Sequence, residues 1–385
     1  MAEPGTGGPL SIYVVVGEES GDALGADLVA ALRRMRPSTR FLGLAGPRMR
    51  GLGLTSLFDI SDISVMGLAG VVGRLPTLAQ RIGQVAGDIV ARRPDVVVLI
   101  DSPDFSFRVA RRVKRRLPGI PIVKYVCPSV WAWRPGRARA MVGTIDHILA
   151  LLPFEPKVLA ELGGPPATYV GHPLAARFAD MNARPVSAEK VLLVLPGSRR
   201  SEVRLLLPDI AATLDILARR GNALTVILPA VAHLEDEIRR TVAAWPRPPQ
   251  IVSGEAAKLE AFARADAALA ASGTVLLELA LHRVPTISIY RLDWLMYLFR
   301  GLITGWSAAL PNLITDEALV PERVDDMIRP GWLARAIEAL LRDGLERRTQ
   351  VEGFERMAQI LAPTEAPGTI AARKVLELAG RAPTA

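Results

Sequence analysis

The alternation of short apolar segments with helical ones constrains the fold of this chain more than any other feature of its sequence. Asp95–Ile100 reads DVVVLI, a continuous apolar run typical of a central parallel strand that is buried on both faces. Residues 74–92 before it have apolar positions three or four apart, as one face of a helix does. A basic helix is expected at 105–117, and another strand at Ile120–Val126. This alternation predicts a doubly wound α/β sheet with right-handed crossovers.

The same alternation occurs twice along the chain, which indicates two domains. The first series opens with strands at Ser11–Val16 and Arg40–Leu44, separated by a helix at 22–35. Residues 173–190 are polar and contain two prolines, so we interpret them as the linker between the domains. A length of 385 residues also favours two domains over one. Two such domains would form a ligand-binding cleft at the carboxyl ends of their strands.

The second series begins after the linker and runs to the end of the chain. Its expected strands are Lys190–Leu195, Leu224–Leu228, Ile251–Val252, Ala267–Ala271 and Thr286–Ile289. Its expected helices are 202–220, 233–244, 259–265, 275–281, 331–343 and 349–380.

Composition excludes several classes of protein. The single cysteine, Cys127, allows no intrachain disulfide, which suits a reducing compartment. No run of about 20 apolar residues exists, so no segment is expected to span a membrane. The first residues have no basic region typical of a signal peptide. A net charge of +8 favours anionic partners, but no nucleic-acid-binding motif accompanies this charge.

Much of the positive charge gathers in the predicted helix at 105–117 and just after it. The basic side chains are Arg108, Arg111, Arg112, Lys114, Arg115, Arg116, Arg134, Arg137 and Arg139. They form either a solvated helix face or a patch that meets an anionic surface, and the sequence leaves both interpretations open.

The motif GEESGD, Gly17–Asp22, follows the first strand and begins a helix. Gly17 and Gly21 allow the backbone to approach a ligand closely, and a helix N-terminus offers free N–H groups. An anion or a sugar hydroxyl beside Glu18, Ser20 and Gly21 is one interpretation. The other is a plain turn in which Ser20 or Asp22 caps the helix.

The motif LIDSPDF, Leu99–Phe105, places Asp101 at the carboxyl end of the buried strand. A partly desolvated carboxylate has a raised pKa and can act as a general base. Alternatively, Asp101 only accepts hydrogen bonds from turn amides, and Asp104 caps the following helix.

The segment YVCPSVWAWR, Tyr125–Arg134, contains two tryptophans in a chain whose aromatic content is only 5%. An aromatic loop at the end of a strand can form a platform for a sugar or an acyl chain, with Ser129 and Trp131 as candidates. The alternative is a loop that fills the core of its own domain. His172, in VGHP before the linker, is a further candidate for contact with the cleft.

Two further turns lie between a strand and a helix in the second series. In LPGSRRSEV, Gly197 and Ser198 form a phosphate-compatible turn, and Arg199 supplies a cation for a diphosphate. In ASGTVLLELAL, the turn Ser272–Thr274, with Gly273 at its centre, precedes Glu278 by one helical turn. The Glu278 carboxylate can accept both ribose hydroxyls of a nucleotide, or it is a surface glutamate.

The motif LPNLITDE contains Asn312, which can bond a diphosphate or a sugar but is by itself only a turn residue. No D-x-D triplet occurs, and the four histidines show no ligand spacing, so we expect no metal site. No cofactor is expected either. The pattern G-x-S-x-G and a Cys/His signature are also missing, which argues against hydrolysis by a covalent nucleophile.

Taken together, these segments resemble the bacterial lipid-A-disaccharide synthase family. The similarity runs in the same order from about residue 11 to 321, and YVxPSVWAWR, LPGSR and ASGT carry most of it. The resemblance implies a GT-B fold, two Rossmann-like doubly wound domains that face a cleft. It implies an acceptor domain at 10–175, completed by a C-terminal helix at 350–380, and a donor domain at 176–349.

The reaction that the resemblance implies is an inverting, metal-independent glycosyl transfer. The donor is UDP-2,3-diacylglucosamine, and the acceptor is 2,3-diacylglucosamine 1-phosphate (lipid X). The alternatives are a UDP-sugar 2-epimerase of the same fold, another GT-B transferase with a different lipid acceptor, and a non-catalytic basic binding module.

Site residues follow from the resemblance one by one. Asp101 matches the family's base, and Asn312 matches an asparagine that is required for function. The donor-binding matches are Gly197, Ser198, Arg199, Ser272, Gly273, Thr274 and Glu278. The acceptor or cleft candidates are Glu18, Ser20, Gly21, Ser129, Trp131 and His172. Glu19 and Cys127 depart from the pattern, which has a small residue and a serine at these positions.

The resemblance also implies an anionic membrane surface as a partner, and peripheral attachment to the cytoplasmic face of the inner membrane. A homodimer is a further expectation, and nucleic acid is not expected. Two apolar stretches are candidates for contact with lipid: residues 63–72, and Trp294–Phe299 followed by Arg300, Leu302, Ile303 and Trp306. The alternative for each is ordinary core.

Overall fold

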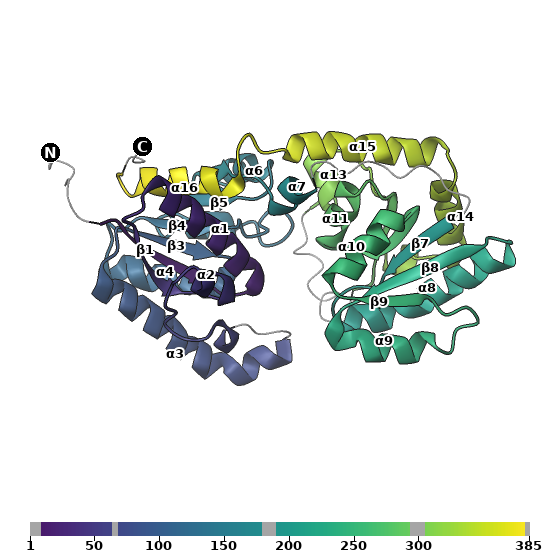
Figure 1. Ribbon diagram of the computed structural model, residues 1–385, viewed down its shortest axis with the longest axis horizontal. Coiled ribbons are helices and arrows are strands. Elements are labelled where there is room, and N and C mark those ends of the chain that lie inside the picture. Colours follow the sequence, from purple (N-terminus) through teal and green to yellow (C-terminus); the bar gives the residue numbers. More distant parts are fainter. Residues whose placement is uncertain (1–8, 64–67, 179–189, 293–304, 382–385) are drawn as a thin grey trace. The chain divides into compact units, whose positions relative to one another are not determined.

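The computed structural model describes residues 9–63, 68–178, 190–292 and 305–381. Its contacts divide the chain into two units, which are described separately here (Figure 1). Unit 1 comprises residues 1–173 and 363–385, and unit 2 comprises residues 174–362. Among the described residues, no helix is long and apolar enough to cross a membrane.

Unit 1 is built on a parallel sheet of six strands in the order β2-β1-β3-β4-β5-β6. Its strands are β1 Ser11–Val16, β2 Arg40–Leu44, β3 Val96–Ile100, β4 Ile122–Tyr125, β5 His147–Ala150 and β6 Ala167–Tyr169. Its longer helices are α1 Glu19–Met35, α3 Leu68–Arg92, α4 Pro103–Arg116 and α16 Pro367–Leu378. Its shorter ones are α2 Pro47–Gly51, α5 Arg137–Met141 and α6 Glu155–Glu161.

The strand order of unit 1 places its loops where a ligand can bind. From β1 the chain moves outward to β2, and then returns to β3 on the other side of β1. The carboxyl ends of β1 and β3 therefore form a topological switch point, which is where open α/β sheets bind their ligands. GEESGD follows β1 and LIDSPDF follows β3, so the fold brings these two motifs together.

Two loops meet very closely at this switch point. A Cβ atom added to Gly17 would lie 2.0 Å from Oγ of Ser102, so only glycine fits there. Asp101 and Ser102 have φ values of 55° and 42°, left-handed conformations that non-glycine residues seldom adopt. Such strain concentrates at functional sites, where the surrounding structure maintains it.

The last helix, α16, packs against α1 in unit 1, although nearly the whole of unit 2 lies between them in sequence (Figure 1). It adds Ala371, Ala372, Val375 and Leu376 to the core of unit 1. The continuous helix expected at 349–380 is wrong. The structure has α15, Leu345–Leu361, and then α16, because Pro363 and Pro367 cannot continue a helix.

Unit 2 has a second parallel sheet of six strands, in the order β12-β11-β10-β7-β8-β9. Its strands are β7 Lys190–Leu195, β8 Leu224–Ala230, β9 Gln250–Ser253, β10 Ala267–Ala271, β11 Thr286–Tyr290 and β12 Glu322–Val324. Its helices are α7 Pro173–Arg177, α8 Arg200–Arg219, α9 Glu235–Val242, α10 Glu255–Arg264, α11 Val275–Leu281, α13 Leu310–Thr315, α14 Pro330–Leu341 and α15.

The switch point of unit 2 lies between β7 and β10. The turns LPGS and ASGT follow these two strands, so they too meet at one edge of a sheet. The predicted doubly wound α/β architecture is confirmed in both units. The linker predicted at 173–190 begins instead with the helix α7, and residues 179–189 lie outside the described residues.

The contact between α16 and α1 yields a stability prediction. A Cβ added to Gly368 would lie 2.8 Å from the carbonyl oxygen of Asp27, a backbone atom of α1. We expect Gly368→Ala to lower the free energy of unfolding by about 1 kcal/mol, since overpacking outweighs the gain in helix propensity. Gly331→Ala is the control, because a Cβ there meets nothing within 4 Å. Chemical denaturation of both variants provides the measurement, and equal stabilisation would contradict the expectation.

Candidate functional site

At the carboxyl end of β3 in unit 1, the Asp101 carboxylate accepts hydrogen bonds from two groups. Oγ of Ser20, in the first turn of α1, donates at 3.1 Å, and the backbone N–H of Ser102 donates at 2.8 Å. Gly21 faces the same side chain, since a Cβ added to it would lie 3.5 Å from Cβ of Asp101. The structure therefore brings Ser20, Gly21 and Asp101 together around one carboxylate.

Two further ionisable groups belong to this cluster. Burial and the neighbouring Asp101 carboxylate raise the pKa of Glu18 above its ordinary value. Lys124, on β4, is only 3% exposed, and burial lowers its pKa to about 8 against the opposing effect of Asp101. Nothing in the sequence marks Lys124 as part of a site, because a lysine in IPIVKYV is equally typical of an exposed position on an edge strand.

The alternative interpretations of Asp22 and Asp104 as caps of their own helices are wrong. Asp22 is buried and accepts the N–H groups of Gly46, Arg48 and Met49, so it caps α2 rather than α1. The exposed Asp104 carboxylate forms an ion pair with Arg137. Ser20 does not cap α1 either, since the N-terminal residue of that helix has no side-chain cap.

The tryptophan loop packs partly into unit 1. Cys127 and Val130 are buried, whereas Ser129 is exposed. The Trp131 ring meets Phe154 edge to face at 5.5 Å, and its Nε1 donates to Glu155 at 3.3 Å. Burial raises the pKa of Glu155 to about 7. Part of the loop thus packs into the core of unit 1, while its tryptophan rings stay partly exposed, and its use as a platform for a sugar or an acyl chain stays a prediction.

His172 lies at the end of unit 1, beside the returning C-terminal segment. Burial lowers its pKa to about 4, so the imidazole is neutral at pH 7. The preceding Gly171 has a φ of 93° and contacts Pro363 and Pro367. Its sequence neighbour Gly171 therefore places His172 near the start of the C-terminal segment.

Unit 2 holds a cavity of about 670 Å³ at its switch point. Every donor-binding residue predicted from the sequence lines it: Gly197, Ser198, Arg199, Ser272, Gly273, Thr274 and Glu278. The wall is completed by the ends of β8 and β9 and by Lys258 of α10. The volume suits a ligand of nucleotide size.

The two turns that line this cavity differ in their free N–H groups. Glu202, in the first turn of α8, accepts the N–H groups of Ser198 and Arg199, and its other oxygen bonds the Arg199 side chain at 2.8 Å. Within the described part of the chain, the N–H groups of Gly273 and Thr274 have no protein acceptor. The turn before α11 is therefore open to an anion, whereas Glu202 closes the turn before α8.

Glu278 is held in place by a lysine that the sequence analysis did not single out. Lys258 Nζ donates to Glu278 Oε2 at 2.8 Å and also pairs with Glu255 at 2.8 Å. Burial lowers the pKa of Lys258, but its hydrogen bonds with both carboxylates outweigh burial and the net pKa is raised. The Glu278 side chain is 16% exposed, so it is not a surface glutamate.

Asn312 does not line the cavity; it lies in the interior of unit 2. Its Nδ2 donates to the carbonyl of Val320 at 3.0 Å and to Oγ of Ser307 at 3.2 Å, and its Oδ1 accepts the Val320 N–H at 2.7 Å. The side chain is only 2% exposed. The Asn312 amide thus positions the backbone of Val320, and α13 replaces the turn expected there.

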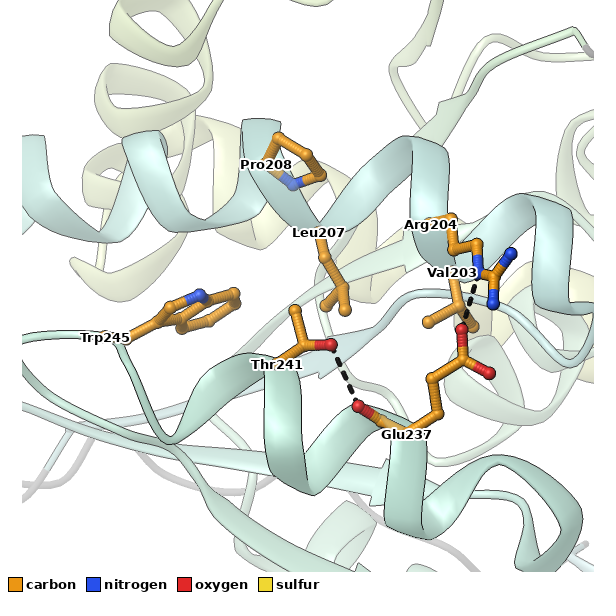
Figure 2. A pocket seen from close by; sticks show the side chains of 7 residues that line it. All are labelled: Val203, Arg204, Leu207, Pro208, Glu237, Thr241 and Trp245. Atoms are coloured by element: carbon orange, nitrogen blue, oxygen red, sulfur yellow. Dashed lines mark hydrogen bonds and ion pairs between the residues drawn. The ribbon is translucent and has the colours of Figure 1, made fainter.

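A second hollow of unit 2 lies between α8 and α9 and has a volume of about 190 Å³ (Figure 2). Val203, Leu207 and Trp245 form its apolar part. Its one carboxylate, Glu237, is paired with Arg204 at 2.6 Å. None of the predicted site residues lines this hollow, so it is not the candidate site.

The basic segment of α4 is mostly exposed, but its members differ. Lys114 is held within the fold by Asp146 at 2.7 Å and by the carbonyl of Ile120 at 2.8 Å. Arg112, Arg115 and Arg116 line a shallow hollow of about 310 Å³ beside α3. Residues 64–67 and 293–304, which include part of the first predicted lipid-contact stretch and most of the second, lie outside the described residues. Nowhere in the described ranges do three His, Cys, Asp or Glu side chains gather as a metal site requires.

Comparison with solved structures defines the class of fold. The glycosyltransferase of kitacinnamycin superposes with a TM-score of 0.60 at 16% identity, covering 96% of this chain and 99% of that one. S. aureus MnaA, solved with UDP, gives a TM-score of 0.61 at 13% identity, covering 96% and 97%. The two parallel-sheet units are thus those of a GT-B-type protein, and the predicted fold is confirmed.

Comparison of sequences then narrows the class to one family. A family model described as lipid-A-disaccharide synthetase matches residues 12–372. A lipid-A-disaccharide synthase of Nitrobacter winogradskyi is 47% identical over 377 residues, which are 95% of this chain and 95% of that protein. The chain belongs to the lipid-A-disaccharide synthase family of glycosyltransferases. The resemblance seen in its motifs is confirmed.

The position of Asn312 generates a prediction. Asn312→Ala leaves the buried Val320 backbone groups without partners, so we expect the free energy of unfolding to fall by roughly 2 kcal/mol. Asn222→Ala is the matched control, because that partly exposed amide donates to Leu217 and Glu338 near the surface. The free energy of unfolding of Asn222→Ala should fall by less than about 1 kcal/mol. Denaturant titration compares the two, and an unchanged stability of Asn312→Ala would refute the positioning role.

Proposed function

We propose that the chain transfers 2,3-diacylglucosamine from UDP-2,3-diacylglucosamine to the 6-hydroxyl of 2,3-diacylglucosamine 1-phosphate (lipid X). The products are a β-1,6-linked lipid A disaccharide 1-phosphate and UDP. The observation that carries the proposal is the family match over residues 12–372, which spans the Asp101 cluster and the cavity of unit 2. Single displacement inverts the configuration at the reacting carbon and needs one base and a stabilised leaving group.

Asp101 is the proposed base. The acceptor 6-oxygen forms a bond to C1 of the donor sugar while the bond from C1 to the diphosphate oxygen breaks, and UDP leaves with that electron pair. The proton of the hydroxyl passes to the Asp101 carboxylate. The hydrogen bonds from Ser20 and Ser102 support this role, because they orient the carboxylate before the substrate arrives.

The cavity of unit 2 is the proposed site of the UDP moiety. The open N–H groups of Gly273 and Thr274 suit the diphosphate, and Arg199 is a cation that can exchange its Glu202 partner for a phosphate. The Arg199 side chain is 72% exposed, so this exchange needs little rearrangement. Glu278, oriented by Lys258, suits the ribose hydroxyls.

Ser129, Trp131 and His172 are proposed to belong to the acceptor region of unit 1, together with Glu18. We place the enzyme peripherally on the cytoplasmic face of the inner membrane, with the exposed arginines of α4 as the contact with anionic headgroups. The hollow lined by Arg112, Arg115 and Arg116 supports this placement. A homodimer belongs to the same proposal, and sedimentation of the purified protein tests it.

Solved UDP-sugar 2-epimerases share the fold at 11–13% identity, but the family match favours the transferase over this alternative. The two functions differ in their need for an acceptor. Purified protein with the diacylated donor should release UDP only when lipid X is added. UDP release or donor isomerisation without lipid X would instead favour an epimerase or a hydrolase, and no product in either case would exclude the proposed transfer.

Asp101→Asn should lower kcat by roughly 10²- to 10⁴-fold, the usual contribution of a general base, with little change in the KM for the donor. Asp104→Asn is the matched control, since its carboxylate is exposed and pairs only with Arg137. We expect that control to keep its activity within a few-fold of the native enzyme. Steady-state formation of UDP measures both variants, and equal activities would remove Asp101 from the role of base.

Glu278→Gln should raise the KM for the donor roughly tenfold and leave kcat nearly unchanged, since it loses a charge-assisted bond to ribose that forms equally in ground and transition states. Glu255→Gln removes the other carboxylate partner of Lys258 and provides the control. A tenfold loss of kcat in Glu278→Gln at an unaltered KM would contradict a ribose-binding role.

A further inference from the structure

Lys124 is a charged residue in the core of unit 1. It lies on β4, a central strand, and its side chain is 3% exposed. Its ammonium group donates to three backbone carbonyls, those of Leu99, Asp101 and Tyr125. These carbonyls belong to the carboxyl ends of β3 and β4 and to the turn that follows β3. The three donors of the lysine thus have three acceptors at the switch point of the sheet.

A buried ammonium without a carboxylate in direct contact is an expensive feature. Burial disfavours the charged form by several kcal/mol, and a methionine of similar length would fill the same space without that penalty. The titratable groups that face the ammonium are the carboxylates of Asp101 and Glu18 and the thiol of Cys127. The positive charge of Lys124 therefore acts on the cluster of ionisable groups that contains the proposed base, Asp101.

The backbone around Asp101 also depends on Lys124. Asp101 and Ser102 both adopt left-handed conformations, which are unfavourable for residues other than glycine and persist only where the surroundings maintain them. The ammonium holds the carbonyl of Asp101, and Oγ of Ser106 donates to the same oxygen at 2.7 Å. These bonds fix the turn that presents the carboxylate to Ser20.

We propose that Lys124 is a positioning residue of the transfer reaction, which clamps the Asp101–Ser102 turn through charge-assisted hydrogen bonds and places a positive charge near the Asp101 and Glu18 carboxylates. The inference rests on the proposed function, because it concerns the same base. The charge of Lys124 also opposes the rise that burial and Asp101 cause in the pKa of Glu18. The lysine acts through Asp101 and need not touch the substrate.

The test compares Lys124→Gln and Lys124→Arg in the full-length enzyme. Glutamine retains donors for the carbonyls but has no charge, whereas arginine retains the charge. We expect Lys124→Gln to lower kcat at pH 7 by roughly tenfold or more, with the KM for the donor within about twofold, because the proposed donor cavity belongs to unit 2. Folded Lys124→Arg should recover most of the kcat that Lys124→Gln loses.

The pH profile separates this role from a structural one. In the native enzyme the ammonium, whose pKa is about 8, loses its proton as the pH rises, and the rate should fall there. That alkaline limb should be missing in Lys124→Gln and shifted upward in Lys124→Arg.

Lys114→Gln is the matched control. Lys114 also bonds backbone carbonyls of unit 1, but its ion pair is with Asp146, away from the base. We expect its pH profile to equal that of the native enzyme. The inference is overturned if Lys124→Gln keeps the native rate and profile, or if Lys114→Gln shifts both equally.

Failure of the proposed function would be distinguishable from failure of this inference. In the first case the native enzyme itself would form no UDP with lipid X present. If Lys124→Gln does not fold, the alkaline limb of Lys124→Arg decides instead: an upward shift supports the inference, and an unchanged limb overturns it.

Discussion

Both candidate sites of this protein depend on the parallel pairing of two strands at the point where the strand order of a sheet reverses. In unit 1, β1 pairs with β3, and in unit 2, β7 pairs with β10. Parallel strands end at the same edge of a sheet, so the loops that follow them must meet there. In unit 1 the loops approach so closely that Gly17 has no room for a Cβ beside Ser102. Sequence segments separated by some eighty residues become one site because of this pairing.

Electrostatics at both edges follow one arrangement. In each candidate site a lysine from a neighbouring element interacts with a carboxylate. Lys124 interacts with Asp101 through its charge, and Lys258 donates a hydrogen bond to Glu278. The two lysines differ in the groups that accept their hydrogen bonds. Lys124 is enclosed by carbonyls, which leaves its charge to act on the carboxylates, whereas Lys258 bonds its carboxylate directly. The first arrangement places a positive charge near a carboxylate without direct contact, and the second fixes the direction of a carboxylate by a hydrogen bond.

Turns at strand ends were recognisable in the sequence because each follows an apolar run and precedes a helical period, and Asp101, Ser272 and Glu278 were found in this way. The roles of their neighbours were not recognisable. Glu202 begins the helix expected at 202–220, yet its carboxylate occupies the N–H groups of the turn before α8. Asn312 looked like a ligand contact, yet its amide bonds both backbone groups of Val320. Hydrogen bonds between distant segments leave no periodic signal.

The sequence by itself determined the α/β class, the two series of strands, the order of the motifs and the family. These depend on local apolar periodicity and on short motifs, which a linear chain displays directly. Only the tertiary structure decided which motifs share an edge, that α16 returns to α1, and that a lysine on a central strand bonds the turn that carries Asp101. The physical reason is that strand order and side-chain burial come from packing between segments far apart in the chain. A lysine in an apolar strand has the same sequence neighbours whether its charge faces water or a carboxylate.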